Sequence, residues 1–229
     1  MQIIASGVWT ATSDLRRTLA TSTSTTTFTF ATWYKSSWMG AMVLNAGVTA
    51  QRHTFAWNSQ NDGRIGFQHQ VDAAQYAAFP PLTTAWPYLG MWVHVQIAVD
   101  TTQPALGDRV RIWFDGVAQI LDNTGALDLL QDQALYLGDT VMHAFGRKWD
   151  GAFSWTGALA ETYVIWGHAL APDSFIELTT VGLRSMVYAG PVTSESVYFD
   201  YQTPGENRFF GQPDWTAAGI TSNTTDLPY

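Results

Sequence analysis

The sequence predicts an all-β protein, an antiparallel β-sandwich or jelly roll with one short helix. Short apolar segments of period two recur along the 229 residues and are separated by Gly, Pro, Asn and Asp, which is typical of strands joined by turns. The composition is 14% aromatic and only 13% charged, which favours aromatic-rich strands over helical bundles. Only one segment carries the end signals of a helix.

The first 27 residues are predicted to form an N-terminal arm and an edge strand. The run from Thr18 to Thr27 is rich in Thr and Ser, and is either a linker or a strand, since Thr is a strand former. It leads directly into a strand at residues 28–34. Three shorter strands are predicted at residues 42–46, 53–57 and 65–71. Residues 28–201 are predicted to form the sandwich and residues 202–229 an extended C-terminal tail that packs on the domain or on a neighbour.

Between residues 72 and 90 the alternation stops, which predicts a long loop. Loops of this length often bind a ligand or pack on a neighbouring molecule. The candidate contact residues are the aromatic side chains of this loop, together with a tryptophan next to Arg147 and Lys148 in a second predicted loop at 140–151: Tyr76, Phe79, Trp86, Tyr88 and Trp149.

The central element is a hairpin from Gly90 to Gly116. Apolar residues alternate along residues 93–99 and again along residues 110–114, which predicts two antiparallel strands with one buried face. The other face would carry Trp92, His94 and Gln96 opposite Arg111 and Trp113. Such a polar, aromatic face either binds sugars or is covered by a loop or a subunit, and covering is favoured.

After this hairpin the sequence predicts strands at residues 134–138, 159–166 and 197–201. The one predicted helix starts at Pro172, has Asp173 and Glu177 near its N-terminal end, and stops at Gly182.

Composition excludes several classes of function. The formal charge is −8 and there are only two lysines, which argues against binding to a nucleic-acid backbone. No apolar run approaches the roughly 18 residues that span a bilayer, so no membrane insertion is expected, and the first residues lack the pattern of a secretory signal. The absence of cysteine excludes disulfides and thiolate metal sites.

Several segments resemble a known fold. FTFATWYKSS, WVHVQIAVDTT, DRVRIWFDG, ALYLG and FSWTGALAETYVIWGHALAPDSF resemble, in order and spacing, the concanavalin A-like or laminin G-like jelly roll. In addition, SDLRRTLATS, AVDTTQ, GALAETYVIWGHALAPDSF, VYFDYQ and DWTAAGITSNTTDLP are similar to segments of tailed-bacteriophage virion structural proteins that carry this domain.

The resemblance implies a non-enzymatic virion protein on the particle exterior, as a capsid decoration or a head or tail fibre subunit. Its implied partners are other capsid or tail proteins and further copies of itself, with a trimer favoured. Synthesis in the host cytoplasm agrees with the missing signal peptide and cysteines. The alternative is a lectin-like adhesin that binds host or environmental glycans, and a weaker alternative is a glycoside hydrolase.

Motifs for catalysis are absent. Retaining glycosidases need two carboxyl groups about 5 to 5.5 Å apart, and none of the four glutamates has an acidic residue two positions away on its strand. We therefore expect no enzyme and name no catalytic residue. No cofactor is expected except Ca²⁺, for which the candidate ligands are Asp139, Asp62 and Asp150, although Asp is commoner as a turn former.

Overall fold

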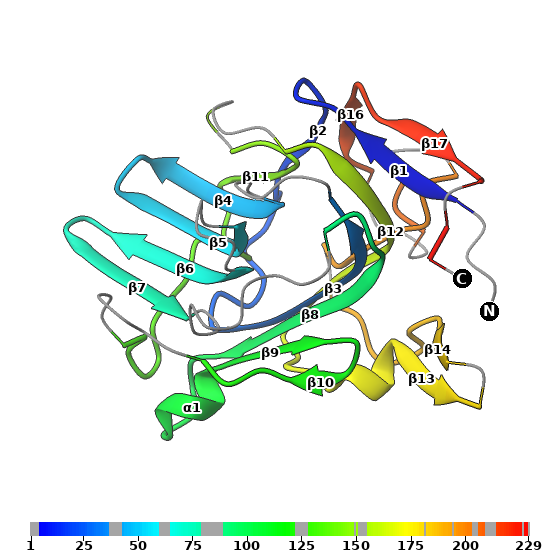
Figure 1. Ribbon diagram of the computed structural model, residues 1–229. Helices are drawn as coiled ribbons and strands as arrows, with labels where there is room; N and C mark the ends of the chain where they lie inside the picture. Colours follow the sequence, from blue (N-terminus) through cyan, green and yellow to red (C-terminus); the bar gives the residue numbers. More distant parts are fainter. Residues whose placement is uncertain are drawn as a thin grey trace.

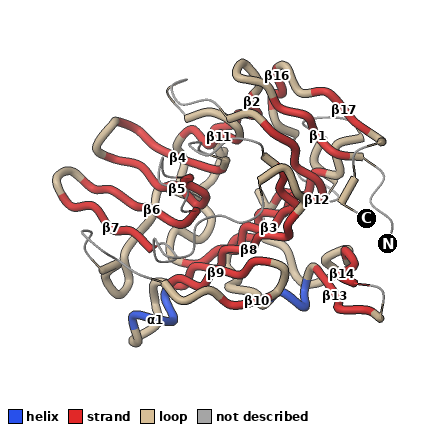
Figure 2. Tube along the Cα trace, viewed as in Figure 1, coloured by secondary structure: helices blue, strands red, loops and turns tan. Residues whose placement is uncertain are grey.

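The protein consists of two antiparallel β-sheets packed face to face (Figure 1). The computed structural model describes residues 5–36, 43–59, 65–78, 89–121, 128–148, 150, 155–180, 182–193, 195–202, 206–208, 214–225 and 227–228. Strands dominate the described chain (Figure 2), which confirms the all-β sandwich.

The larger sheet has eight strands in the described residues and will be called the eight-stranded sheet. Its order is β10 (Val117–Ala118), β9 (Val110–Phe114), β8 (Val93–Asp100), β3 (Thr27–Lys35), β12 (Gly157–Trp166), β1 (Ser6–Trp9) and β17 (Thr221–Asn223), with β15 (Val197–Phe199) also paired to β12.

The second sheet, the seven-stranded sheet, has the order β16 (Thr216–Ala218), β2 (Asp14–Thr18), β11 (Met142–Phe145), β4 (Leu44–Thr49), β5 (Arg52–Ser59), β6 (Ile65–Val71) and β7 (Ala74–Ala78). A separate hairpin joins β13 (Ile176–Thr179) to β14 (Gly182–Ser185). The described helices are α1 (Leu106–Arg109) and a 3-10 turn at Pro172–Ser174.

The central hairpin is confirmed. Strand β8 pairs antiparallel with β9, with Val95 opposite Phe114 and Val99 opposite Val110. The predicted strands at residues 28–34, 53–57, 65–71 and 159–166 are also confirmed, each within a few residues of its observed bounds.

The predicted helix from Pro172 to Gly182 is wrong. Pro172 and Asp173 start only a 3-10 turn, and the chain then forms the β13–β14 hairpin. The physical reason is tertiary packing, because alternation places Ile176 on the face that packs against Trp33. The short helix α1 lies in the predicted loop between β8 and β9.

Three further predictions are corrected. Residues 134–138 are not a strand; Leu135 donates a backbone hydrogen bond to Thr25, and its side chain is buried. The predicted loop at 140–151 contains β11, which fits between β2 and β4. The predicted loop at 72–90 contains β7, which pairs with β6.

The two ends of the chain form one bent ribbon, which we call the terminal ribbon (residues 6–18 and 216–223). β1 pairs with β17 in the eight-stranded sheet, and β2 pairs with β16 in the seven-stranded sheet. Both segments cross between the sheets, and at the crossing the Ser13 hydroxyl donates a hydrogen bond to the carbonyl of Gly219, which has a positive φ of 63°. The ribbon therefore closes one side of the sandwich. β2 ends at Thr18, the first residue of the Thr-rich run, and β3 begins at Thr27, its last, so residues 19–26 connect the two strands.

The main core fills the space between the sheets. Inward residues of the eight-stranded sheet, such as Phe30 and Ile97, meet Phe145 and Leu44 of the seven-stranded sheet. A second, smaller core covers the outer face of the eight-stranded sheet, where Tyr163 and Ile165 pack against Phe175 and Tyr188.

Candidate functional site

The outer face of the central hairpin is covered. Gln96 lies opposite Trp113, as predicted, but the Gln96 amide donates a 2.6 Å hydrogen bond to the Leu170 carbonyl, and Arg111 donates one of 3.3 Å to Ala169. His94 is only 2% exposed and packs edge-on against Trp33. Burial lowers its pKa to about 3, so it is neutral. The prediction that this face of the hairpin is covered, which was favoured over sugar binding, is confirmed. The face is not open to solvent.

Tyr76 is a core residue and not, as predicted, a contact residue in a loop. It lies on β7, is buried, and stacks on the ring of His69 with 5.9 Å between ring centres. The other aromatic candidates, Phe79, Trp86, Tyr88 and Trp149, lie outside the described residues.

The candidate calcium ligands are not brought together. Asp139 accepts a 2.7 Å hydrogen bond from the backbone N–H of Thr140, which is the role of a turn-forming Asp. Asp150 forms a 2.8 Å ion pair with Lys148. Asp62 lies outside the described residues. Within the described ranges, no three His, Asp or Glu side chains are grouped to hold a metal ion.

A row of polar side chains lies on the outer face of the seven-stranded sheet. Asn45, His53, Gln68 and Lys148 belong to it, and all four are buried. Asn45 donates a 2.8 Å hydrogen bond to the carbonyl of Arg147, so it holds the segment after β11 against the sheet. Burial also lowers the pKa of His53. These side chains stabilise the fold rather than presenting a surface to ligands.

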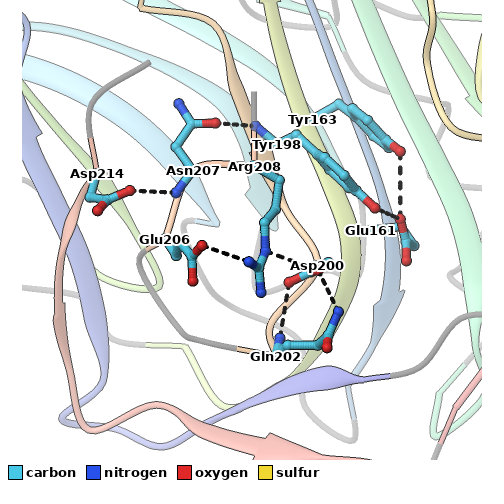
Figure 3. Close-up of polar contacts among 9 residues, drawn as sticks. All are labelled: Glu161, Tyr163, Tyr198, Asp200, Gln202, Glu206, Asn207, Arg208 and Asp214. Atoms are coloured by element: carbon cyan, nitrogen blue, oxygen red, sulfur yellow. Dashed lines mark hydrogen bonds and ion pairs between the residues drawn. The ribbon is translucent and has the colours of Figure 1, made fainter. Parts of the chain in front are cut away.

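A buried carboxyl group lies on β12, at Glu161 (Figure 3). The strand bulges between Ala160 and Tyr163, and Glu161 has a positive φ of 48°, which is rare for a non-glycine residue. Its Oε2 atom accepts a 2.6 Å hydrogen bond from Tyr198 and a longer one, 3.5 Å, from Tyr163. Burial raises the pKa of Glu161 to about 7.

Beyond Tyr198 the same network reaches the tail (Figure 3). Asn207 accepts a 3.0 Å hydrogen bond from the Tyr198 backbone N–H and donates one of 2.8 Å from its own N–H to Asp214. Arg208 pairs with Asp200 at 3.0 Å and with Glu206 at 2.6 Å. Glu161 and Asp200 are both almost fully buried, so the network fixes the tail to β15 and presents no carboxyl pair to a substrate.

Sequence reasoning missed this network, although one signal was present. Glu161 is the single acidic residue within the otherwise apolar run GALAETYVIW. A carboxyl group in a strand buried on both faces needs partners, because an unpaired buried charge is costly. The partners of Glu161 are Tyr198 and Tyr163, and only Tyr198 is distant from it in sequence.

An open pocket of about 300 Å³ lies where β1, β3, β12 and β17 end, and we call it the rim pocket. Its floor contains the buried residues Trp9 and Ala158. Polar side chains form the walls: Lys35, Ser36, Thr156 and Asn223. The terminal ribbon contributes both Trp9 and Asn223, so the pocket depends on the docked chain ends.

The polar groups of the rim pocket are held in place. The Ser36 hydroxyl donates a 3.0 Å hydrogen bond to the Thr156 carbonyl. The Oδ1 atom of Asn223 accepts 2.9 Å hydrogen bonds from the backbone N–H and the hydroxyl of Thr225. The Lys35 ammonium lies 5.9 Å from the centre of the Trp92 ring. Lys35, Thr156 and Asn223 therefore line one open concavity with an ammonium, a hydroxyl and an amide, and Trp92 lies beside the Lys35 ammonium.

Gly157 makes this arrangement sterically possible. A Cβ atom at this position would lie 2.4 Å from both the Lys35 carbonyl oxygen and the Trp155 ring. Only glycine lets β12 approach the end of β3 this closely.

Comparisons with known proteins identify the fold. No protein-family model matches the chain, and no curated protein matches its sequence. A proposed carbohydrate-binding protein from Bacteroides ovatus is similar in structure, with a TM-score of 0.59 and 15% identity over all of this chain and 62% of that one. The heptameric SAP-like pentraxin from Limulus polyphemus has a TM-score of 0.50 and 18% identity over 75% of this chain and 80% of its own.

Domains 4-5 of the mouse laminin alpha1 chain are also similar, with a TM-score of 0.49 and 10% identity over 84% of this chain and 46% of that one. The two packed antiparallel sheets, together with the likeness to the Bacteroides ovatus protein and to the pentraxin, show that the chain has the concanavalin A-like (laminin G-like) jelly-roll fold that its sequence predicts. Among the described residues, no helix is long and apolar enough to cross a membrane.

Proposed function

We propose that this chain is a non-enzymatic, lectin-like protein that binds glycans in the rim pocket. The observation that carries the proposal is the convergence of Lys35, Ser36, Thr156 and Asn223 on one open concavity beside Trp92. Ligand sites are typically concave, with apolar walls and a few placed polar groups.

The chemistry of the pocket suits a sugar ring. Ammonium and amide N–H groups donate to sugar oxygens, and the Ser and Thr hydroxyls both donate and accept. An indole offers a flat apolar surface to the C–H groups of a pyranose. The Bacteroides ovatus protein of the same fold, itself proposed to bind carbohydrate, supports this choice of ligand class.

The test is a glycan array with the labelled protein, followed by calorimetric titration of each glycan that binds. Lys35→Ala removes a charged donor, and we expect about tenfold or greater loss of affinity, because a hydrogen bond involving a charged group contributes roughly 1.5–3 kcal/mol. Asn223→Ala removes a neutral amide, so we expect a smaller loss, about two- to tenfold, from a hydrogen bond of roughly 0.5–1.5 kcal/mol. Thr156→Arg places a long side chain from an exposed wall position into the pocket and is expected to abolish binding.

Arg184→Gln is the matched control, because Arg184 is an exposed residue of β14 that pairs only with Glu177 among the described residues. It should bind as the unmodified protein does. A glycan that binds equally well to the Thr156→Arg protein, or an array without any bound glycan, would contradict the proposal. Release of reducing sugar from a bound glycan would instead favour a glycoside hydrolase.

A second candidate function is a structural subunit of a virion surface, as a capsid decoration or fibre protein. The observation that favours it is a set of exposed apolar side chains near β10 and β13, where Val117 is 65%, Ile120 82% and Leu178 83% exposed. The β9–β10 turn lies against β13, since a Cβ on Gly116 would be 3.4 Å from Ile176 (Figure 1). Exposed apolar surface of this kind is typical of contacts between subunits.

Two measurements test this second function. Light scattering should give the mass of an oligomer, with a trimer favoured, and Leu178→Glu should dissociate it. Labelled antibody should locate the protein on the exterior of intact virus particles. A monomer at high concentration together with unlabelled particles would exclude the structural function and leave glycan binding untouched.

A further inference from the structure

The side of the sandwich away from the terminal ribbon contains a partly open pocket. Its lining residues come from β6 and the edge strand β7 of the seven-stranded sheet, from β9 of the eight-stranded sheet and from α1, and Figure 1 shows where these elements lie. Its volume is about 240 Å³, and we call it the edge cavity. The rim pocket shares no lining residue with it.

Apolar side chains form most of the lining of the edge cavity: Phe67, Leu106, Val110, Leu121 and Leu129. Phe67, Val110 and Leu129 are almost fully buried. An engineered apolar cavity of about 150 Å³ stays dry and binds benzene, so the edge cavity has room for an apolar body larger than one ring.

One charged side chain, Arg109, also lines the cavity. Its guanidinium is held by three backbone carbonyls, with hydrogen bonds of 2.8 Å to Gln103, 2.7 Å to Leu129 and 2.8 Å to Pro104. These three bonds fix the plane of the guanidinium and use three of its five N–H groups.

Among the residues that the structure describes, no acidic side chain pairs with the positive charge of Arg109. All three acceptors are uncharged carbonyls, and no carboxylate in the described part of the chain forms an ion pair with it. A partly buried guanidinium without an acidic partner is unusual in a protein with formal charge −8. The remaining N–H groups suit the two oxygens of a carboxylate.

We propose that the edge cavity binds a small carboxylate with an apolar body. The carboxylate contacts Arg109, and the apolar body packs against Phe67, Val110 and Leu129. Charge complementarity selects an anion, and the apolar lining selects a hydrocarbon chain or ring over a sugar or a hydrophilic acid. This site is independent of the glycan site.

Calorimetric titration with octanoate tests the proposal, with octanol and acetate as the comparison compounds. Octanoate should bind at a single site. Octanol lacks the charge and acetate lacks the apolar body, so each should bind at least about tenfold more weakly, the loss expected when a hydrogen bond to a charged group or a comparable apolar contact is removed.

A charge substitution in α1 provides the sharpest variant. Leu106 lies three residues before Arg109, on the same side of the helix, and is 39% exposed, so it tolerates a polar side chain. Leu106→Glu supplies an internal carboxylate to Arg109 and should abolish octanoate binding. Leu106→Gln is the matched comparison, because it changes shape and polarity in the same way without the charge; it should weaken octanoate binding only by the lost apolar contact, and far less than Leu106→Glu does.

Thermal unfolding of both variants shows that the fold is kept, and Leu106→Glu should unfold no earlier than Leu106→Gln. Equal binding of octanoate by the two variants, equal binding of octanol and octanoate by the unmodified protein, or no binding of octanoate at millimolar concentration would each overturn the proposal. None of these outcomes bears on glycan binding at the rim pocket.

Discussion

The hydroxyl group of Tyr198 donates a 2.6 Å hydrogen bond to Oε2 of Glu161 inside the fold. The ring of Tyr198 stacks on Tyr163 with 4.4 Å between ring centres, so both aromatic residues press against the same bulge of β12. Desolvation of the Tyr198 side chain raises its own pKa above the usual range, and it therefore keeps its proton. A protonated Glu161 fits this site better than an ionised one.

Glu161 makes stability depend on pH. Its pKa rises from 4.5 in the unfolded chain to about 7 in the folded protein, so the folded protein holds the proton more tightly. The stabilising contribution is complete below about pH 4.5 and is lost as the pH rises through about 7. Glu161→Gln should be more stable than the unmodified protein at pH 8, by up to about 3 kcal/mol, and gain little at pH 4.5. Urea unfolding of both proteins at the two pH values measures this, and a stability difference that is the same at both would contradict it.

Three buried histidines act in the opposite direction. Burial lowers the pKa of His69, His94 and His143 to about 4, 3 and 4, from 6.5 in the unfolded chain. Nε2 of His143 accepts a hydrogen bond from the Gly138 N–H, and Nδ1 contacts the Val141 carbonyl. A ring nitrogen that accepts carries no proton, so the ring is neutral. The contribution of the three neutral histidines to the free energy of unfolding is complete above pH 6.5. It is lost as the pH falls toward 4, because the same histidines bind protons at higher pH in the unfolded chain than in the folded protein. In the Glu161→Gln background, which removes the opposing effect of Glu161, the urea midpoint should therefore drop between pH 7 and pH 5, and adding His94→Phe should make that drop smaller. A midpoint that does not change over this range in that background would show that folding does not lower these pKa values.

Gly157 should tolerate no side chain. In Gly157→Ala the new Cβ would meet the Lys35 carbonyl and the Trp155 ring at 2.4 Å, so β12 or β3 must shift. We expect a loss of about 2 kcal/mol or more, since overpacking typically costs 1–3 kcal/mol. Gly107→Ala is the control, because its Cβ meets no atom within 4 Å and Ala favours the helical turn by up to about 1 kcal/mol. Equal stability of the two variants in urea would mean that the strands yield without cost.

Trp215 should anchor the tail. Its buried ring contacts Phe145 at 5.2 Å on one sheet and Phe199 at 6.0 Å on the other, measured between ring centres. Trp215→Ala should lower the free energy of unfolding by roughly 3–5 kcal/mol. Thr216→Ala, at the adjacent exposed position, should change it by no more than about 0.5 kcal/mol. Similar chemical denaturation curves for the two variants would show that the tail is dispensable for stability.

Most of the fold could be predicted from the alternation of apolar and polar residues. The errors lie in segments whose own residues do not show how they pack or pair. Alternation identifies β3, β8, β9 and β12 because their own side chains make the pattern. It fails at residues 172–182. There Pro172 and Asp173 are local signals for a helix, but the tertiary contact between Ile176 and Trp33 favours a strand. β11 and β7 were missed because they are short and begin inside polar segments.

The candidate site was less predictable. Sequence reasoning selected Arg111 and Trp113 for their residue types, and it favoured a covered face without identifying the segment that covers it. The rim pocket combines Lys35, Thr156 and Asn223 from distant parts of the chain, so no local spacing indicates it. The pairing of β3 with β12 brings Lys35 close to Thr156, and the pairing of β1 with both β12 and β17 adds Asn223.

The pairing of β1 with β17 has a consequence for how the domain can be carried within a longer polypeptide. Ser6 and Asn223 lie directly opposite each other at the same sheet edge. The first and last strands of the domain are therefore neighbours, and the segment after Asn223 stays on the domain, where Leu227 packs against the cluster around Trp33, so the whole domain should accept insertion into a surface loop of another protein. Joining the two ends of the chain and opening it at an exposed turn, such as Asp72, should likewise give a circular permutant with the same sheets.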